Sequence, residues 1–253
     1  MARTKLTVCL LTFNSMRTLP RCLEPILTFA DEIVVVDSGS TDGTLEYLRS
    51  QGLDAVYRPY DFHSNQMNYA ISLSSNDWVL CMDSDEFLDP ETIGEIERLK
   101  DREKDPSHAY RITRYWRVLG REVHAIYPVS SPDHPVRLFD RRFARFNGEP
   151  VDDKPKGHTS TSILPGHVVH DTFFDIHEVF HKLNKYTSTL VTHKNVDPSL
   201  PKAFFNPFPA FIKWYFFKGA YRDGRVGVVT GVYASLYTFL KYFKAWYGSG
   251  ETS

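Results

Sequence analysis

The first hundred residues alternate short apolar runs of strand length with segments of helical periodicity. The predicted strands are residues 6–12, 33–36, 55–57 and 78–82, and the predicted helices are residues 18–29, 44–50 and 65–73. A run of consecutive β-branched residues such as 33–36 suits a strand buried on both faces of a parallel sheet. The alternation therefore predicts βαβ units and an α/β fold with a doubly wound, Rossmann-like sheet that has helices on both faces.

The alternation ends near residue 105. The elements predicted beyond it are antiparallel strands at 109–119 and 136–146, and helices at 175–192, 210–221 and 226–246. Four prolines between residues 198 and 209 separate the last two helices from the rest of the chain. We therefore predict a domain over residues 1–201, with halves at about 1–104 and 105–201, and a helical extension over residues 202–253.

Polar side chains follow three of the predicted strands, where an open α/β sheet binds its ligands. They are Thr12 and Asn14, then Asp37 and Ser38, then Asp83, Asp85 and Glu86. The three carboxylates of the last group repel one another unless a hard cation shares them with an anionic ligand. Asp83 and Asp85 point the same way in an extended chain. The alternative interpretation is a solvated acidic turn before a helix that begins near Pro90.

Three segments carry a family resemblance: residues 10–14 (LLTFN), 33–44 (IVVVDSGSTDGT) and 77–88 (DWVLCMDSDEFL). In order, strand-end placement and spacing they resemble the inverting glycosyltransferases of family 2, which are nucleotide-sugar enzymes of the GT-A fold with a DXD metal motif. Residues 136–139, 145–146, 151–153 and 239–242 also resemble one bacterial branch of that family, similar to lipopolysaccharide core glucosyltransferases.

The resemblance implies roles for the residues at the strand ends. Thr12 and Asn14 would contact the nucleotide, and Asp37, with Ser38 beside it, the uracil or ribose. A carboxylate can accept a hydrogen bond from uracil N3–H, which cytosine lacks. For residues 39–43 the alternative interpretation is turn and helix-capping chemistry.

The resemblance also implies a divalent metal, Mg²⁺ or Mn²⁺, that bridges the donor diphosphate. Asp85 and Asp83 are the predicted metal ligands, with Asp83 also facing the ribose or a metal-bound water, and His170 is a further candidate near the metal or diphosphate. In the predicted helix, Gln66 and Asn68 would hydrogen-bond the donor. Relatives often carry a basic residue where this chain has Met67, so His63 or an arginine of the second half would supply that charge.

An inverting sugar transfer needs one carboxylate that accepts the proton of the acceptor hydroxyl. In the resembling branch, a pair of residues that includes a glutamate follows the Arg-Phe strand, and here that pair is Asp152-Asp153. Asp153 holds the corresponding position and is the predicted base, with Asp152 and Glu149 as rivals. The alternative is a solvated acidic loop. Four arginines nearby suit phosphate or acidic sugars, or a solvated strand face: Arg137, Arg141, Arg142 and Arg145.

Charge separates the last fifth of the chain from the rest. With 30 Lys+Arg and 31 Asp+Glu the chain has a net charge of −1, so no basic excess predicts nucleic-acid binding. Residues 202–253 carry seven Lys/Arg and two acids, a net of +5, so the other residues sum to −1 − 5 = −6. The same residues hold 16 of the 36 aromatic side chains, which favours an anionic membrane surface as partner. Packing of these helices on the catalytic domain or on a second subunit is the alternative.

The sequence as a whole predicts an enzyme that moves a sugar from a nucleotide-sugar donor, a UDP-hexose, to a saccharide or lipid-linked acceptor of a bacterial cell envelope. Three sparse cysteines indicate a reducing compartment, and residues 1–20 read as a first strand rather than a signal. We expect a peripheral protein on the cytoplasmic face of the inner membrane, because the apolar run in 227–243 is too short to span. A nucleotidyltransferase of similar fold and a non-catalytic sugar- or membrane-binding module are the alternatives.

Overall fold

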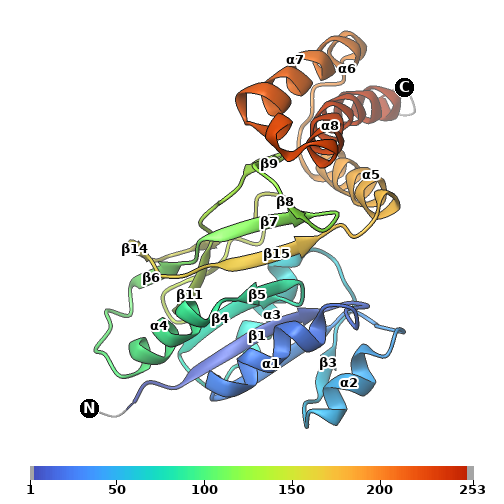
Figure 1. Ribbon diagram of the computed structural model, residues 1–253. Coiled ribbons are helices and arrows are strands. Elements are labelled where there is room, and N and C mark those ends of the chain that lie inside the picture. Colours follow the sequence, from blue (N-terminus) through green and yellow to red (C-terminus); the bar gives the residue numbers. More distant parts are fainter. Residues whose placement is uncertain (1–2, 250–253) are drawn as a thin grey trace. The chain divides into compact units, whose positions relative to one another are not determined.

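A computed structural model describes residues 3–249 of the chain (Figure 1). Residues 1–2 and 250–253, which include the last four residues of the predicted extension, lie outside the described residues. The chain forms two compact units. The first unit contains residues 1–114 and 134–170, and the second contains residues 115–133 and 171–253.

A seven-stranded sheet forms the centre of the first unit within the described residues, with strand order β14-β6-β11-β4-β1-β2-β3. Its strands are β1 (Leu6–Thr12), β2 (Glu32–Asp37), β3 (Ala55–Tyr57), β4 (Trp78–Asp83), β6 (His108–Arg111), β11 (Val136–Asp140) and β14 (Ser160–Ile163). Strands β1, β2, β3 and β4 run parallel, whereas β11 runs antiparallel to its neighbours β4 and β6. The predicted α/β class, with strands and helices alternating through the first hundred residues, is confirmed.

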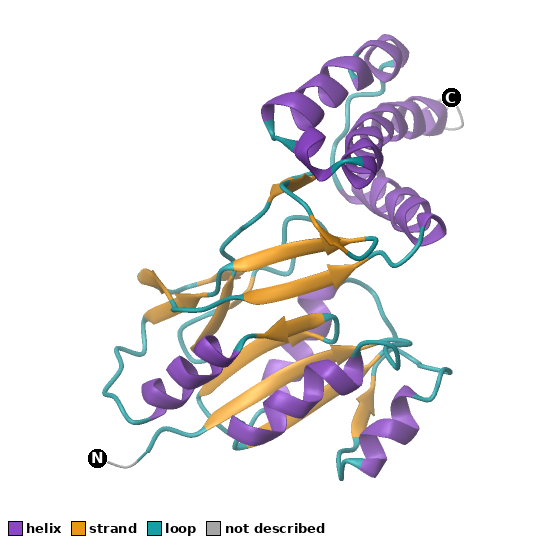
Figure 2. Ribbon diagram, viewed as in Figure 1, coloured by secondary structure: helices purple, strands orange, loops and turns teal. Residues whose placement is uncertain are grey.

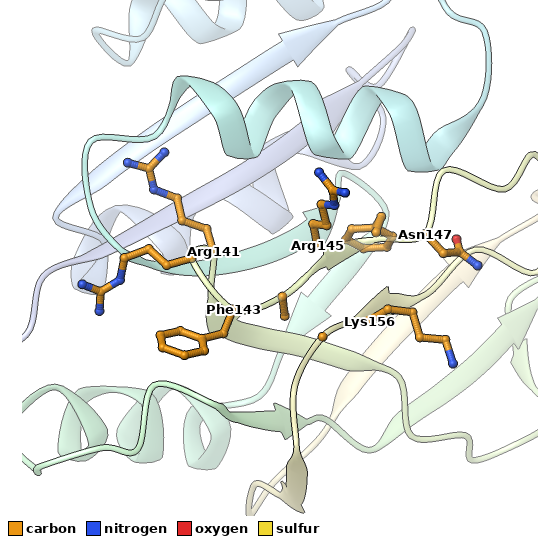
Figure 3. Close-up of a pocket in the computed structure, with 9 residues that line it drawn as sticks. Arg141, Phe143, Arg145, Asn147 and Lys156 are labelled. Atoms are coloured by element: carbon orange, nitrogen blue, oxygen red, sulfur yellow. The ribbon is translucent and has the colours of Figure 1, made fainter.

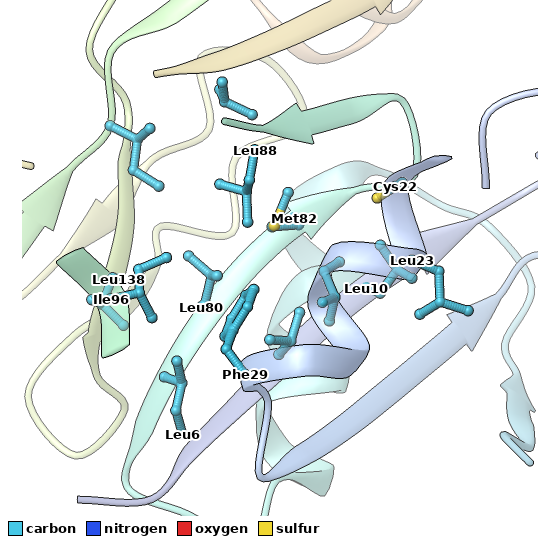
Figure 4. Close-up of a cluster of buried hydrophobic side chains, with 14 of the residues drawn as sticks. Leu6, Leu10, Cys22, Leu23, Phe29, Leu80, Met82, Leu88, Ile96 and Leu138 are labelled. Carbon is cyan, nitrogen blue, oxygen red and sulfur yellow. The ribbon is translucent and has the colours of Figure 1, made fainter. Parts of the chain in front are cut away.

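Helices cover both faces of this sheet (Figure 2). They are α1 (Leu19–Phe29), α2 (Thr44–Ser50), α3 (His63–Leu73) and α4 (Pro90–Lys100). Side chains alternate along each strand: in β4, Leu80 joins the cluster packed against α1 and α4, and Cys81 joins the cluster packed against α3. Figure 4 shows the first of these clusters, in which Leu23 of α1 is fully buried. Because both faces are buried, the parallel strands are continuously apolar up to their carboxyl ends.

Short strands complete the first unit, and two of them flank the loop of residues 147–154. They are β5 (Glu86–Leu88), β12 (Arg145–Phe146), β13 (Pro155–Lys156) and β15 (Val168–Thr172), the last of which continues into the second unit. The single strand predicted at 136–146 is in fact two strands, β11 and β12, because residues 141–144 form a turn between them. The strand predicted at 109–119 is also two, β6 and β7 (Arg114–Val118), with a break at residues 112–113.

The second unit is a small β region and a set of helices. Its elements are β8 (Arg121–Glu122), β9 (Ala125–Ile126), β10 (Val129–Ser130), α5 (Ile176–His193), α6 (Leu200–Phe205), α7 (Pro207–Ile212), a π-helical turn (Lys213–Phe217), a 3-10 turn (Ala220–Asp223) and α8 (Arg225–Ser249). Gly227 lies so close to the carbonyl oxygen of Ala220 that a Cβ atom would stand 1.7 Å from it, so only glycine fits there. No helix within residues 3–249 combines the length and apolar character needed to cross a membrane.

The units divide the chain differently from the predicted boundary at residue 201. Helix α5 belongs to the second unit because Val179 and Leu183 on its inner face pack with Val226 and Tyr233 of α8. Apolar burial thus groups α5 with the predicted extension, and residues 115–133 join the same core through Val123.

Candidate active site

The carboxyl ends of β1, β2 and β4 lie side by side in the first unit. Thr12 is in register with Asp37 on β2, and Leu11 is in register with Asp83 on β4. Parallel pairing therefore brings the polar residues that follow the three strands to one edge of the sheet, as ligand-binding α/β sheets do.

Asp37 organises the turn that follows β2. It is 1% exposed. Its Oδ1 accepts hydrogen bonds of 2.8 Å from the backbone N–H groups of Gly39 and Ser40. Its Oδ2 accepts from the hydroxyls of Thr12, at 2.7 Å, and Ser40, at 2.6 Å. Gly39 has a φ of +100°, a backbone conformation that residues other than glycine rarely adopt. The carboxylate thus holds the turn, and its direct contact with a nucleotide stays a prediction.

Asn14 and Ser38 also take part in this edge. Asn14 adopts a left-handed φ of 48°, and its side-chain oxygen accepts a hydrogen bond of 2.8 Å from the N–H of Thr41. The Ser38 hydroxyl accepts a hydrogen bond of 2.9 Å from the buried amide of Gln66. These contacts link β1, β2 and α3 around the edge.

Asn68 supports a strand. Its side-chain amide both donates to the carbonyl and accepts from the N–H of Phe146, each at 3.0 Å, which pins β12 to α3. Met67 beside it is fully buried and packs in the core. Donor contacts by Gln66 and Asn68 stay predictions.

The three acidic residues after β4 have three different environments. Glu86 is 1% exposed and is neutralised by Arg137 and by Arg114, whose Nη1 lies 3.0 Å from Glu86 Oε1. Arg137 also reaches Asp83 Oδ2 at 3.3 Å. Burial would lower the pKa of Arg137, but the charges of Glu86 and Asp83 raise it above its ordinary value. Glu86 is therefore part of a buried ion-pair group that fixes the β4–β5 turn.

His63 joins Asp83 to the predicted base. Its Nδ1 lies 2.5 Å from Asp153 Oδ2, and its Nε2 lies 3.0 Å from Asp83 Oδ1. Burial would lower the pKa of His63, but the charge of Asp83 and the hydrogen bond to Asp153 raise it to about 10. Burial would likewise raise the pKa of Asp83, whereas His63 and Arg137 hold it well below its usual range. An imidazolium thus bridges two carboxylates.

His63 is one candidate for the positive charge that position 67 lacks, and this role near the diphosphate stays a prediction. It begins α3 one helical turn earlier, so the same face of the helix carries it. The signal available in the sequence was this spacing of four residues. Nothing in the linear pattern indicated that Asp153, 90 residues away, would be its partner.

The rivals for the base lie in different surroundings. Asp152 has a left-handed φ of 65° and a side chain that is 79% exposed, and it pairs with Lys154 at 3.2 Å. Glu149 is exposed, and its backbone carbonyl accepts a hydrogen bond of 2.8 Å from Ser64. The Asp153 side chain reaches the strand-end edge through His63.

Asp85 and His170 form the pair with metal-binding chemistry. The β5–β15 ladder places His170 in register with Glu86, and His170 Nε2 lies 3.2 Å from Asp85 Oδ1. Within the described residues no group of three or more acidic, histidine or cysteine side chains could hold a metal by itself. A carboxylate and an imidazole fit a divalent ion that completes its shell with diphosphate and water. Asp83 has other partners, His63 and Arg137, and its role as a second metal ligand stays a prediction.

Comparison with known proteins agrees with this fold and edge. The family model "Glycosyl transferase family 2" matches residues 7–146, more than half of the chain. An α/β sheet that gathers polar side chains at its carboxyl edge belongs to a class of ligand-binding folds. Within that class, this chain belongs to glycosyl transferase family 2, a family of sugar-transferring enzymes, and the predicted family and GT-A fold are confirmed.

Relatives share this family. An uncharacterized glycosyltransferase of Rickettsia typhi is 29% identical over 143 residues, which cover 56% of this chain and 48% of the relative. The chain thus spans about half the length of that relative. The lipopolysaccharide core biosynthesis glycosyltransferase LpsC of Rhizobium meliloti is 28% identical over 249 residues, which cover 93% of this chain and 89% of the relative.

Two solved structures are similar to this chain at low sequence identity. Glucosyl-3-phosphoglycerate synthase from Mycobacterium tuberculosis, in complex with Mn²⁺, UDP-glucose and phosphoglyceric acid, is 23% identical and has a TM-score of 0.37 over 46% of this chain and 45% of that chain. Residues 1–349 of S. aureus TarS are 12% identical, with a TM-score of 0.45 over 99% of this chain and 92% of that chain.

Proposed function

We propose that this protein transfers a hexose, with inversion, from a UDP-sugar to a saccharide or lipid-linked acceptor in cell-envelope polysaccharide or lipopolysaccharide synthesis. The link between Asp153, His63 and Asp83 carries the proposal, because it brings a candidate base to the edge where the family binds its donor. The similarity to LpsC over most of both chains supports a lipopolysaccharide core acceptor. Family membership favours sugar transfer over nucleotidyl transfer or binding alone.

Asp153 is the proposed base. Its Oδ2 is engaged by His63, so we assign uptake of the acceptor hydroxyl proton to Oδ1. His63 keeps its proton and holds the carboxylate in place, since its pKa of about 10 leaves it charged near neutral pH. With the proton removed, the acceptor oxygen attacks the anomeric carbon from the face opposite the leaving diphosphate, which gives inversion.

Asp85 and His170 are the proposed protein ligands of the metal, and Asp83 faces the donor beside them. When bound, a divalent ion would neutralise the charge that develops on the leaving diphosphate. The protein's own part is to hold one carboxylate and one imidazole 3.2 Å apart at the strand-end edge. His170 reaches this position because β15 pairs with β5.

The test is a titration of the full chain with several nucleotide sugars, with and without Mn²⁺, followed by thermal unfolding and sugar release. A UDP-hexose should raise the melting temperature more strongly with Mn²⁺ than without it. Asp85→Ala should remove the Mn²⁺-dependent part, and Glu91→Ala, on the exposed start of α4, is the matched control. Equal stabilisation of both variants by UDP-hexose and Mn²⁺ would exclude Asp85 as a ligand.

We also propose that the second unit contacts an anionic membrane on the cytoplasmic face. Five phenylalanine side chains within residues 204–217 are 53–82% exposed: Phe204, Phe205, Phe208, Phe216 and Phe217. A single exposed apolar side chain is ordinary, but five within fourteen residues indicate an interaction surface. Lys213 and Lys218 lie among them, and aromatic rings with cations suit the headgroup region of anionic lipid.

Vesicle co-sedimentation tests this surface. Changing Phe205, Phe208 and Phe217 together to Gln should release the chain from anionic vesicles, whereas Leu27→Gln with Leu73→Gln, at exposed sites of the first unit, should not. High salt should release the wild-type chain partly, since it screens the lysines but not aromatic burial. Recovery of the wild-type chain in the supernatant at low salt would refute membrane contact.

A further inference from the structure

A basic pocket lies beside the turn that joins β11 to β12 in the first unit (Figure 3). It has a volume of about 510 Å³, and four of its lining residues are cations: Arg141, Arg142, Arg145 and Lys156. No acidic residue lines it. A neighbouring hollow of about 690 Å³ shares the three arginines and reaches Asn68 on α3, again without an acid. The two hollows thus form one cationic surface, here called the basic pocket.

Two of its cations, Arg145 and Lys156, start from opposite backbone positions, and their charged ends point in different directions (Figure 3). They are register partners on the antiparallel β12–β13 ladder. Neither side chain has an ion-pair partner within the described residues. Because the described residues neutralise neither charge, both cations are available to an anion that enters the basic pocket.

The two arginines of the turn have contrasting surroundings. Arg142 pairs with Asp77 at 2.9 Å and with Asp140 at 2.6 Å, so it holds the end of β11. Arg141 has no carboxylate partner in residues 3–249, and its Nη1 donates one long hydrogen bond of 3.4 Å to the carbonyl of Ile71. Its Nε is buried without a hydrogen-bond partner in the same residues. Arg141 thus has hydrogen-bonding capacity that the protein does not use.

Gly157 brings the two walls of the pocket together. It has a φ of +108°, and a Cβ there would stand 2.1 Å from the backbone oxygen of Phe143. Only glycine permits this approach. The close contact sets the end of β13 against the β11–β12 turn, and so places Lys156 across from the arginines.

The basic pocket adjoins the loop that carries the proposed base. Residues 147–154 connect β12 to β13, and the N–H of Asn147 donates to the carbonyl of Lys154 at 3.1 Å, which closes the loop. Asp153 precedes Lys156 by three residues, so roughly 10 Å of extended chain separates them. Phe146 of β12 packs edge-on against His63, with ring centroids 5.7 Å apart.

We propose that the basic pocket binds a phosphate or carboxylate group of the saccharide acceptor while an acceptor hydroxyl lies at Asp153. That the ligand is the acceptor rests on the proposed function. That it carries an anionic group rests on Arg141, Arg145 and Lys156, which have no carboxylate partner within the described residues. Arginine and lysine recognise such groups through charge-assisted hydrogen bonds. The enzyme would therefore select acidic or phosphorylated acceptors over neutral ones.

The binding test uses glucose 6-phosphate as the probe, with glucose, glucuronate and inorganic phosphate beside it, and no divalent metal. We expect glucose 6-phosphate to bind more tightly than glucose and than inorganic phosphate, with glucuronate also above glucose. Arg145→Gln with Lys156→Gln should weaken glucose 6-phosphate binding by about tenfold or more, the loss expected for charged hydrogen bonds. Lys5→Gln with Arg49→Gln, two exposed cations of the same unit, is the control.

Thermal unfolding gives a second readout that does not need the probe to be the true acceptor. In low salt without anions, Lys156→Gln should melt higher than the wild-type chain, because it removes one of the cations gathered at the basic pocket. Glucose 6-phosphate should stabilise the wild-type chain and not this variant. A variant that melts lower, or that keeps the full stabilisation, would overturn the proposal.

The outcomes separate this inference from the proposed function. Equal binding of inorganic phosphate and glucose 6-phosphate overturns the assignment to a saccharide, and an equal loss in the control overturns the pocket. UDP binding with Mn²⁺ should survive in the Arg145/Lys156 double variant. If the wild-type chain binds glucose 6-phosphate through these residues but shows no Mn²⁺-dependent UDP binding, the proposed function fails while the anion pocket stands.

Discussion

The carboxylates of Asp37 and Asp153 lie at the same edge of the sheet but are held there in opposite ways. Asp37 contacts residues on its own turn and Thr12 on the neighbouring strand, and it is almost fully buried. Asp153 lies on a loop, is partly exposed, and is held by His63, which is 90 residues away in the chain. The proposed donor side is thus built from local turn chemistry, whereas the proposed base is held by one long-range contact. A change on the donor side should disturb binding and folding together, and a change at the base should disturb turnover alone.

The sharpest way to break this comparison is Asp153→Asn. The substitution keeps the shape of the side chain but removes its ability to accept a proton. We expect kcat to fall by roughly 10²–10⁴, the usual contribution of a positioned base, with little change in donor affinity. Steady-state kinetics and UDP titration measure the two quantities. Retention of near-normal kcat would move the base to Glu149 or Asp152.

The donor side is tested by Asp37→Ala. Removal of this carboxylate leaves the Thr12 hydroxyl and two backbone N–H groups without their acceptor, so the turn should lose its shape. UDP affinity should fall by roughly tenfold to a hundredfold, as expected for loss of charged hydrogen bonds, and the free energy of unfolding by about 1–3 kcal/mol. Isothermal titration and denaturant unfolding measure these. Thr41→Ala, on the same turn but donating through its backbone, is the control. Normal UDP binding in Asp37→Ala would remove this turn from the donor site.

His63→Gln sharpens the comparison, because it weakens the link without touching the base itself. Glutamine can donate to one of the two carboxylates but carries no charge, so Asp153 should lose part of its orientation. We expect kcat to fall by about tenfold, the low end for a hydrogen bond to a charged group, with a smaller change in KM for the donor. A loss confined to donor binding would instead assign His63 to the diphosphate.

The smallest effect is expected at Asp152→Asn. This exposed side chain pairs with Lys154 at 3.2 Å, and surface ion pairs contribute little to stability. Turnover should stay unchanged in the assay used for Asp153→Asn. A loss as large as that of Asp153→Asn would show that the two neighbouring acids act as a unit.

Local pattern was sufficient for most elements of the first unit. The predicted strands 6–12 and 55–57 and the predicted helix 44–50 match the structure residue for residue. These elements follow from hydrophobic periodicity and turn residues, which act over a few positions. The strand predicted at 109–119 spans two strands, because an alternating pattern contains no signal for residues 112–113, where the chain leaves the seven-stranded sheet.

The arginines show where pattern reasoning stops. Arg137, Arg141, Arg142 and Arg145 looked alike in the sequence, but each has a different environment. Arg137 is buried against Glu86, Arg142 holds the end of β11, and Arg145 is the register partner of Lys156. Charge alone does not determine a partner, because the partner lies on a strand or turn that folding brings near.

The sequence by itself determined the α/β class, the family and the edge of the sheet where the polar strand-end residues gather, because strand periodicity and strand-end residues can be read along the chain. Tertiary structure alone decided which of these residues meet. It paired Asp85 with His170, joined Asp153 to Asp83 through His63, and moved α5 into the second unit. The physical reason is that charge pairing and apolar burial act through space at a few ångströms, between residues that lie tens of positions apart in the chain.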